Sequence, residues 1–273
     1  MDAKKFGELR ELADRIRITA IEMAYVAGNK GAHLGGSLSS VEIFAVLYGS
    51  VLKIDPMNPL WEKRDRMIVG KEHGRLSEYP ALYESGFISK DILMNYMVDG
   101  NILAGHPLIR EFGMEYSSCS LGMALPVSVG IALNGKRKGK DYRVFTLMGD
   151  GELDEGSMWE AFMSAAHYKL DNLIAIVDRN HLSSDGYTEK VMALGDLKGK
   201  IQKFGWDCVE IENGHDIGQL VDAFSYSPSG RPYAIIANTI KGKGISFAEN
   251  NPNWHHNIMT CDLYAQALKE LGV

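Results

Sequence analysis

The chain has 273 residues with a formal net charge of -6, and 45% of its residues are hydrophobic and 23% are charged. This balance is ordinary for a globular chain and excludes an intrinsically disordered one, and the negative charge gives no electrostatic reason to bind nucleic acid or an anionic membrane surface. The cysteines Cys119, Cys208 and Cys261 are odd in number, far apart and without CxxC spacing, so neither a disulfide framework nor a zinc site is indicated, and a reducing cytoplasm fits best.

The first third of the chain is expected to be mostly helical. Apolar residues recur at helical spacing over residues 9–20, and Gly28 stands where that helix would end. Ser37, Ser39 and Ser40 are candidates to cap a second helix over 41–52. The start lacks the continuous apolar segment of a signal peptide, so we expect a cytoplasmic protein. The remaining expected elements of this part are a strand over 66–70 and helices over 76–86, 89–97 and 120–139.

From residue 142 onward, strands and helices alternate regularly. The expected strands cover 142–150, 172–180, 206–212 and 232–240, with helices over 155–170, 197–205 and 216–224. Continuous apolar strands alternating with amphipathic helices predict an α/β fold, with a parallel sheet covered by helices on both faces. No Pro/Ser-rich hinge interrupts the chain, so one domain over 1–273 with a helical N-terminal third is expected. The stripe expected to pack on the sheet from helix 155–170 is Trp159, Phe162, Met163, Ala166 and Leu170.

Two polar residues follow two of these strands directly. Asp150 comes after the first and Asn180 after the next one along the chain. Ligands of open parallel sheets bind outside the carboxyl ends of the strands, so both can reach one ligand. A carboxylate, an amide oxygen and a nearby carbonyl suit Mg²⁺ or Ca²⁺ shared with a diphosphate, and Gly149 and Gly151 would let the backbone approach phosphate oxygens. A GDG after a strand is also common as a plain capped turn, which stays open for Asp150 alone.

The stretch from Gly149 to Asn180 resembles the thiamine diphosphate motif, which begins with GDG and ends with Asn. The likeness extends to transketolases, and in particular to the N-terminal half-subunit of split transketolases, through WEA, AAHYKLDN, FGWDCVEIENGHD and TIKGKGISFAEN. It runs from about Leu12 to about Asn257. The resemblance implies the thiamine diphosphate-binding fold, thiamine diphosphate and Mg²⁺ as cofactors, and transfer of a two-carbon ketol unit from a ketose to an aldehyde.

The resemblance also implies roles for single residues. Asp150 and Asn180 would be the side-chain ligands of Mg²⁺, and the carbonyl of Leu182 would complete the protein's share. Gly151 would donate its amide to the cofactor diphosphate. The further positions that it places beside the cofactor are Gly149, Leu121, Glu155 and Glu160. Of these, the two glutamates would lie at a subunit interface and link two active sites. For Glu160, a position on a solvent-exposed helix face without such a role is an equally good interpretation.

Four histidines match loops of the family, namely His33 in GAHLGGS, His73 in KEHGR, His106 in AGHP and His255 in WHH. By resemblance, His73 would lie near the diphosphate, His106 would bind the C1 hydroxyl of the donor, and the other two would border the reacting carbonyl. Imidazole suits this role because its pKa lies near neutrality. We expect structural roles for His167, His181 and His215, and His256 has no counterpart in the family.

In the family, the glutamate that activates the aminopyrimidine lies in a second, pyrimidine-binding domain, and no such domain is recognisable here. The chain alone is therefore expected to be inert. The resemblance implies a partner, a C-terminal-type transketolase subunit that carries the pyrimidine-binding domain, in an α2β2 assembly.

The chain departs from the family pattern near the expected site. Cys119 stands where the family has Gly, Met123 where it has Gln or His, and Ala124 where it has a second Gly. Glu72 and Arg75 add charges to the loop that carries His73. These departures leave two alternatives open: a specialised two-carbon transfer to a non-sugar or carrier-bound acceptor, and a non-catalytic partner subunit. A nicotinamide dehydrogenase is disfavoured because no GxGxxG stands between an early strand and helix.

Overall fold

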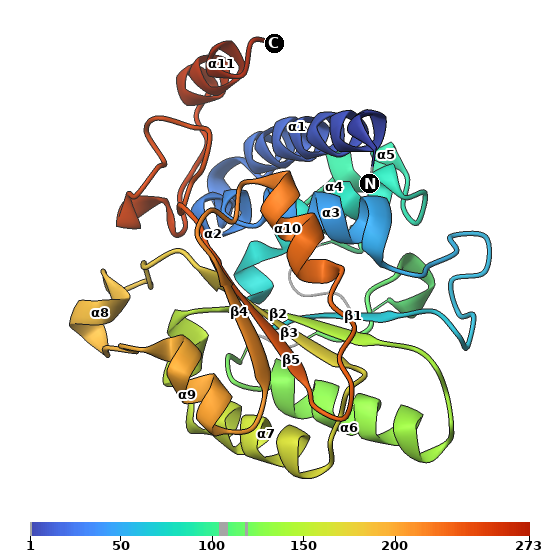
Figure 1. Cartoon of the computed structure of the whole chain (residues 1–273). Coiled ribbons are helices and arrows are strands. Elements are labelled where there is room, and N and C mark those ends of the chain that lie inside the picture. The colour runs from blue at the N-terminus through green and yellow to red at the C-terminus, as the bar shows by residue number, and fades with distance from the viewer. Residues whose placement is uncertain (1, 104–108, 118–119) are drawn as a thin grey trace.

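The computed structural model describes residues 2–103, 109–117 and 120–273. At its centre lies a five-stranded, wholly parallel sheet in the order β1-β2-β3-β5-β4 (Figure 1). Each strand falls inside a stretch that the sequence predicts as a strand, so the parallel α/β fold is confirmed. The strands are β1 (Arg66–Val69), β2 (Val144–Gly149), β3 (Leu173–Arg179), β4 (Asp207–Ile211) and β5 (Tyr233–Asn238).

Helices cover both faces of the sheet, as expected. On the upper side in Figure 1 lie α1 (Ala3–Val26), α2 (Leu34–Leu38), α3 (Val41–Val46), α4 (Arg75–Glu84), α5 (Lys90–Met94), α10 (Ile217–Phe224) and α11 (Cys261–Glu270). On the lower side lie α6 (Ala124–Arg137), α7 (Gly156–His167) and α9 (Leu197–Lys203), and α8 (Thr188–Val191) projects beside the sheet. Among the described residues, no helix has the length and apolar character needed to cross a membrane.

The central strand β3 shows why the apolar runs are continuous. Its residues are all buried, and their side chains alternate between two cores. Ile174 and Ile176 pack with the core of α1, α3 and α4, while Leu173, Ala175 and Val177 pack with the core of α6, α7 and α9. A parallel strand that is covered on both faces needs apolar residues at every position, because successive side chains point to opposite faces.

The connections create a crevice at one edge of the sheet. The helices that directly precede β2, β3 and β4, namely α6, α7 and α9, pack on one face of the sheet, whereas α10 before β5 and α11 after it pack on the other face. The segments that leave β3 and β5, which are neighbours in the sheet, therefore run to opposite faces. Such a switch point is the usual ligand site of an open parallel sheet.

The predicted stripe on α7 is wrong for one residue. Met163 is 58% exposed, whereas Phe162 and Leu170 are fully buried. The face of α7 that packs on the sheet is centred on Met158 and Phe162, and the next residue along the helix is rotated by about 100° away from it. The buried residues of the helix are Met158, Ala161, Phe162 and Ala165.

The predicted serine caps are also wrong. Residues 34–38 form a short helix of their own, and Ser40 precedes α3 without a side-chain capping bond. The Ser40 hydroxyl instead donates to the Ser37 carbonyl at 3.0 Å, and the Ser39 hydroxyl donates to Asp178 Oδ2 at 2.6 Å. The expected helix over 41–52 ends as α-helix at Val46 and continues as a π-helical turn, Leu47–Val51. The helix expected over 120–139 begins only at Ala124, so Pro126 lies in its first turn.

Candidate active site

Asp150 and Asn180 emerge at the same edge of the sheet. Gly149, the last residue of β2, pairs with Asp178 of β3, so the residue after it and the residue after β3 leave the sheet at neighbouring points. Both side chains are buried and line a cleft of about 430 Å³. The sequence-based expectation that they can reach one ligand agrees with this geometry.

The carboxylate of Asp150 is held by backbone amides. Its Oδ1 accepts a hydrogen bond from the Gly151 amide at 2.9 Å, and its Oδ2 accepts one from the His181 amide at 2.7 Å. Burial and the nearby charge of Asp178 raise the pKa of Asp150 despite these bonds. A cation bound beside this carboxylate would offset that burial, so the site suits a metal ion.

Asn180 and Leu182 provide two further oxygen atoms. The Asn180 amide group donates to Asp178 Oδ2 at 3.2 Å, and its Oδ1 accepts a hydrogen bond from the Leu182 amide at 3.1 Å. The Leu182 carbonyl accepts one from the ammonium group of Lys241 at 2.9 Å. A carboxylate, an amide oxygen and a backbone carbonyl are the hard donors that Mg²⁺ prefers, so the residues present fit this ion.

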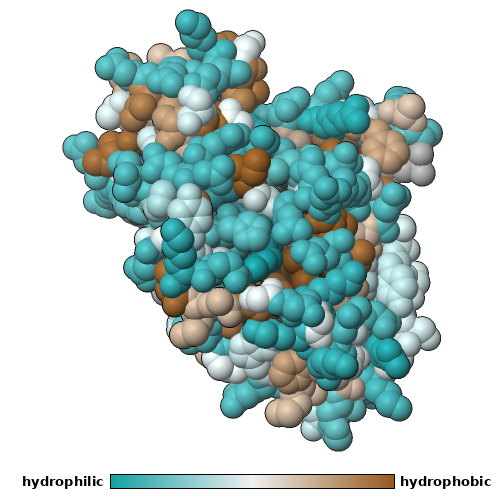
Figure 2. Space-filling model, turned by 60° about the vertical axis from the view of Figure 1, so that its left-hand side comes forward, coloured by the Kyte–Doolittle hydropathy of each residue, from teal (hydrophilic) through white to brown (hydrophobic). Residues whose placement is uncertain are grey.

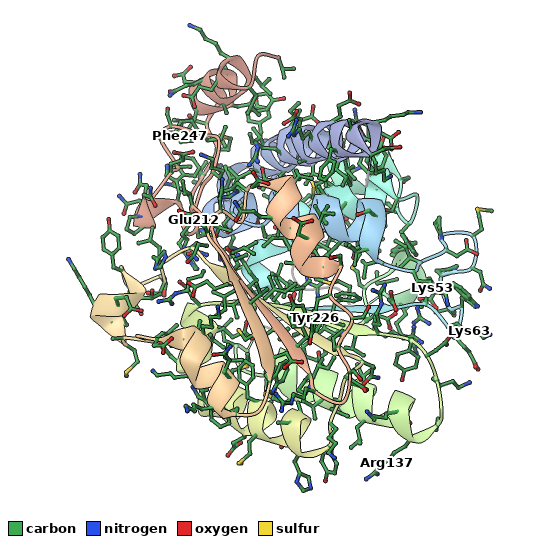
Figure 3. The ribbon with its side chains drawn as sticks, viewed as in Figure 1. Lys53, Lys63, Arg137, Glu212, Tyr226 and Phe247 are labelled. Carbon is green, nitrogen blue, oxygen red and sulfur yellow. The ribbon has the colours of Figure 1, made fainter. Side chains whose placement is uncertain are left out.

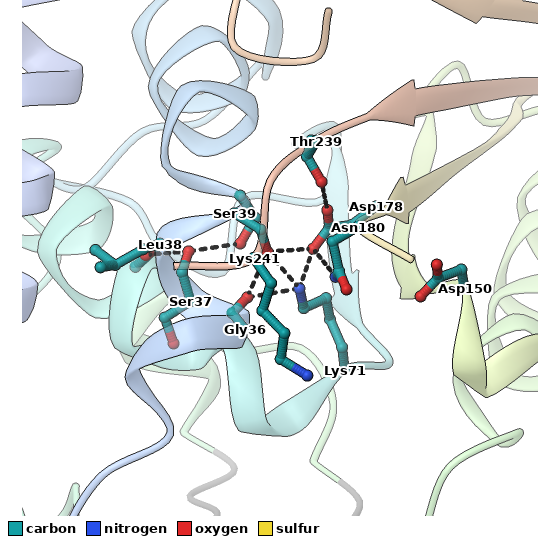
Figure 4. A network of polar contacts seen from close by, with 12 residues as sticks. Gly36, Ser37, Leu38, Ser39, Lys71, Asp150, Asp178, Asn180, Thr239 and Lys241 are labelled. Atoms are coloured by element: carbon teal, nitrogen blue, oxygen red, sulfur yellow. Dashed lines mark hydrogen bonds and ion pairs between the residues drawn. The ribbon is translucent and has the colours of Figure 1, made fainter. Parts of the chain in front are cut away.

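A buried polar network fixes Asn180 from behind (Figure 4). At its centre, Asp178 forms an ion pair with Lys71 and accepts hydrogen bonds from Ser39 and Thr239. Burial by itself raises the pKa of Asp178, but the Lys71 charge and these hydrogen bonds outweigh it and hold the pKa below its usual value. Sequence reasoning missed Asp178, although its position two residues before Asn180 was a usable signal.

Three of the four expected histidines lie together in the cleft. The ring of His33 lies 5.5 Å from that of His255 and 6.0 Å from that of His73, and the last two rings are 4.9 Å apart, between centroids. Burial, followed by the charge of Lys71, holds the pKa of His73 well below its usual value. Burial and the charge of Lys241 lower the pKa of His255 to about 4. Both rings are therefore neutral near pH 7. His106 lies outside the described residues.

Sequence reasoning also missed Lys241. Its ammonium group donates to the carbonyls of Leu182 and Ser183 and contacts Nδ1 of His255 at 3.1 Å. Burial and the charge of Lys71 lower its pKa to about 8, while Asp150 and Asp178 act in the opposite direction. The only signal in the sequence was its place in TIKGKG. The Lys241 ammonium lies against the cleft lining at Leu182 and His255, which favours an anionic ligand, whereas the Lys71 ammonium is paired with Asp178.

The remaining expected residues take different positions. Gly149, Gly151, Leu121 and Glu155 line the cleft. Glu160 is exposed on α7 and does not line it. Two histidines lie elsewhere: the His256 ring packs 4.6 Å from that of His33, and His215 bonds to Glu42 and the Ile240 amide away from the cleft.

The unusual charges of the histidine loop pair with each other. Arg75 is buried, and it donates to Glu72 Oε1 at 2.7 Å and to Glu78 Oε2 at 2.6 Å. It also donates to the carbonyl of Tyr116. Glu72 lines the cleft, so this cluster is part of its wall. Among the other departures, Ala124 begins α6 and Met123 is exposed, while Cys119 lies outside the described residues.

A second, more open groove of about 740 Å³ follows the edge strand β4. It is lined by Cys208, Tyr233 and Tyr226, the last of which is labelled in Figure 3. Burial raises the pKa of the Cys208 thiol to about 12, so this thiol is not a nucleophile near neutral pH. The groove is lined by the carboxylates Asp207 and Asp222 and the amides Gln202 and Gln219, but its lining contains no imidazole. The smaller cleft joins three imidazoles to its carboxylate and amide groups and is therefore the candidate active site.

Comparison with known proteins identifies the family. A model of the transketolase thiamine diphosphate binding domain matches residues 9–273. The chain belongs to the transketolase family. It is 39% identical over 268 residues to a subunit of the apulose-4-phosphate transketolase of Phocaeicola vulgatus, a match that covers 97% of this chain and 93% of that relative. It is 34% identical over 271 residues to human transketolase, but this match covers 99% of the chain and 43% of the relative.

Solved transketolase structures share the fold. The transketolase of Campylobacter jejuni matches with a TM-score of 0.90 at 28% identity, covering all of this chain and 43% of that one. The Leishmania mexicana transketolase matches with a TM-score of 0.89 at 28% identity, covering 97% and 41%. The chain thus spans less than half of these transketolases and nearly the whole length of the apulose-4-phosphate transketolase subunit. The expected thiamine diphosphate-binding fold and the expected likeness to an N-terminal transketolase subunit are both confirmed.

Proposed function

We propose that this transketolase-family chain binds thiamine diphosphate with Mg²⁺ and, together with a partner subunit, transfers a two-carbon ketol unit from a ketose donor to an aldehyde acceptor. One observation carries the proposal: Asp150, Asn180 and the Leu182 carbonyl converge in a cleft that also holds neutral imidazoles. A metal clamp beside groups that can exchange protons with hydroxyls is what diphosphate anchoring and ketose chemistry both require.

The three oxygen donors would hold Mg²⁺, and the Gly151 amide and His73 would contact the diphosphate. Leu121 and Gly149 would border the cofactor. When bound, thiamine diphosphate supplies a nucleophilic carbon for the ketose carbonyl and accepts the electron pair of the broken carbon-carbon bond. The buried lysine Lys241 would offset part of the negative charge that the diphosphate brings into the cleft, since the charge of Lys71 is already paired with Asp178.

The imidazoles would handle the hydroxyl protons of the substrates. A neutral ring can donate from one nitrogen and accept at the other. His33 and His255 would face the reacting carbonyl, and His106 would bind the C1 hydroxyl of the donor. Because Lys241 contacts Nδ1 of His255, the Nε2 atom of this ring is the one left to meet a substrate hydroxyl.

We propose that residues 1–273 act as one diphosphate-binding domain and that a C-terminal-type subunit supplies the pyrimidine-binding domain, in an α2β2 enzyme. Relatives that are named as single subunits of a transketolase support this. The surface in Figure 2 is mostly hydrophilic, with small separate hydrophobic patches. At the cleft, however, Leu121 is 37% and Val191 45% exposed, which suits burial by a partner. Glu155 and Glu160 would then face the interface. Cytoplasmic residence is supported by the free thiols of Cys208 and Cys261.

A specialised substrate is favoured by one further observation, the charged side chain of Glu72 in the cleft wall. Relatives of this chain are named for apulose-4-phosphate and for 6-deoxy-6-sulfo-D-fructose. These two donors are therefore the first to test beside common ketose phosphates. A non-catalytic subunit is the weaker candidate, because the oxygen donors for the metal are all present.

The proposal is tested by calorimetric titration of thiamine diphosphate and Mg²⁺ into the chain co-purified with its partner. Saturable binding is expected, and Asp150→Ala should weaken it at least about tenfold because a charged metal ligand is removed. Asp141→Ala is the matched control, since this aspartate is exposed and lies outside the cleft. A folded complex that binds no cofactor would overturn the proposal.

A further inference from the structure

Glu152 is a buried carboxylate that has no part in the function proposed above. It lies in the 3-10 turn Gly151–Asp154 that follows β2, its residue is 2% exposed, and it lines the floor of the cleft. A carboxyl group is rarely enclosed to this degree unless its neighbours use it. Its contacts therefore indicate which part of the cleft depends on it.

The carboxyl group holds the segment in front of α6. Its Oε1 accepts a hydrogen bond from the Gly122 amide at 3.2 Å. On the other side of the same residue, Ser157 of α7 donates to the Gly122 carbonyl at 2.6 Å. Gly122 is thus fastened through both of its backbone polar groups. Its neighbour Leu121 lines the cleft.

The sequence makes room for this carboxyl group at Gly70, the residue after β1. A Cβ atom at Gly70 would lie 2.6 Å from both oxygens of Glu152 and 2.9 Å from the Cβ of Ala124. A side chain at Gly70 would therefore require Ala124 to shift and the carboxyl group of Glu152 to move out of its place. The side chain of Glu152 therefore lies between Gly70, at the carboxyl end of β1, and Gly122, just before α6.

We propose that Glu152 is a positioning residue that fixes the segment 120–123, and with it Leu121, against the ends of β1 and β2, so that this wall is formed before the cofactor binds. The inference rests on the proposed function only for the claim that segment 120–123 contacts the cofactor. The hydrogen bond between Glu152 and Gly122 does not depend on it. The Glu152 carboxyl group orders the wall as a hydrogen-bond acceptor. When this acceptor is removed, the buried amide of Gly122 is left without a partner, which disfavours the ordered position. Pre-organisation raises affinity because less ordering remains for the binding step.

Three variants of Glu152 differ in whether they keep a hydrogen-bond acceptor for the Gly122 amide. Glu152→Gln keeps the shape and an acceptor oxygen. Glu152→Leu keeps most of the volume and removes the acceptor. Glu152→Asp keeps a carboxyl group but withdraws it from the Gly122 amide, and it remains informative if the leucine variant does not fold. A purely space-filling role would tolerate leucine, whereas the proposed role requires rescue by glutamine.

The test is hydrogen exchange of peptides that contain Gly122, measured on the complex without cofactor, together with calorimetric titration of thiamine diphosphate and Mg²⁺. We expect at least about tenfold faster exchange and tenfold weaker binding for the leucine variant, a smaller change in the same direction for aspartate, and wild-type behaviour for glutamine. Glu42→Gln is the control, because Glu42 is a buried carboxylate on the opposite face of the sheet, bonded to Arg17 and His215. It should lower stability without changing exchange at Gly122.

Wild-type exchange in the leucine and aspartate variants would overturn the inference, and so would a glutamine variant as impaired as leucine. If the wild-type complex itself binds no thiamine diphosphate, the proposed function fails, while the exchange measurement still decides whether Glu152 orders segment 120–123.

Discussion

Lys71 and Asp178 form an ion pair beneath the cleft that is closed off from solvent, with side chains 1% and 0% exposed. The lysine follows β1 and the aspartate belongs to β3, so the pair spans β2, which lies between them in the sheet. The same carboxylate receives the amide group of Asn180. The orientation of Asn180, an expected metal ligand, therefore depends on this buried charge pair.

Replacing Asp178 by Asn should lower both stability and cofactor affinity. The substitution leaves the Lys71 ammonium buried without its counter-charge, for which we expect a loss of about 3 kcal/mol in the free energy of unfolding. It also disturbs the acceptor that orients Asn180, so binding of thiamine diphosphate with Mg²⁺ should weaken about tenfold or more. Urea denaturation and calorimetry measure the two effects. Asp171→Asn is the control, because Asp171 forms a half-exposed pair with Lys136 and should change stability by less than about 1 kcal/mol.

Replacing Lys241 by Met should weaken cofactor binding with little loss of fold. The ammonium group holds the Leu182 carbonyl and contacts His255, and it adds positive charge beside a cleft expected to take a diphosphate. We expect at least a tenfold rise in the dissociation constant of thiamine diphosphate, measured by calorimetry on the complex. Lys243→Met removes a nearby lysine whose pair with Glu249 is partly exposed, and it should bind as the wild type does. Equal affinities for both variants would contradict the role assigned to Lys241.

Glu42 should account for part of the acid sensitivity of the fold. Burial by itself raises its pKa, but His215 and Arg17 outweigh burial and leave the pKa below its usual value. This stabilisation is fully present above the unfolded pKa of about 4.3 and is lost as the pH falls through the lower folded value. Glu42→Gln should therefore be less stable than wild type at neutral pH and lose less stability on acidification, as followed by urea denaturation from about pH 7 to pH 3. Glu8→Gln, on the exposed face of α1, should leave the profile unchanged.

Arg75 and Glu72 should prove strongly coupled. Arg75→Ala leaves Glu72 and Glu78 without their common cation, and we expect it to destabilise the chain by about 3 kcal/mol or more. Adding Glu72→Gly removes one of the two stranded carboxylates, so the double variant should recover part of the loss. A double-mutant cycle by thermal or urea unfolding measures the coupling, and strictly additive effects would show that the pair does not act as a unit.

The elements that position the site were predictable because their signals are local. The strands β2, β3 and β5 are largely continuous apolar runs, and Asp150 and Asn180 were located by the rule that ligands bind where parallel strands end. Lys71, Asp178, Glu152 and Lys241 were missed for the opposite reason. A charged residue in a sequence normally indicates solvent, and these four are buried only because segments distant in the chain enclose them. The Ser39 hydroxyl was misjudged in the same way, since its partner Asp178 lies 139 residues further along.

The divergence of the chain at the switch point has a mechanical consequence. Residues 180–182 lead toward the layer of α9 and line the cleft at Asn180 and Leu182. Residues 239–241 lead toward the layer of α1, and Lys241 reaches the cleft lining by its hydrogen bond to the Leu182 carbonyl. A ligand that contacts both segments would connect the two helical layers of the molecule. Saturation with cofactor should then protect cleavage sites on both layers from a protease in parallel, although only one edge of the sheet is occupied.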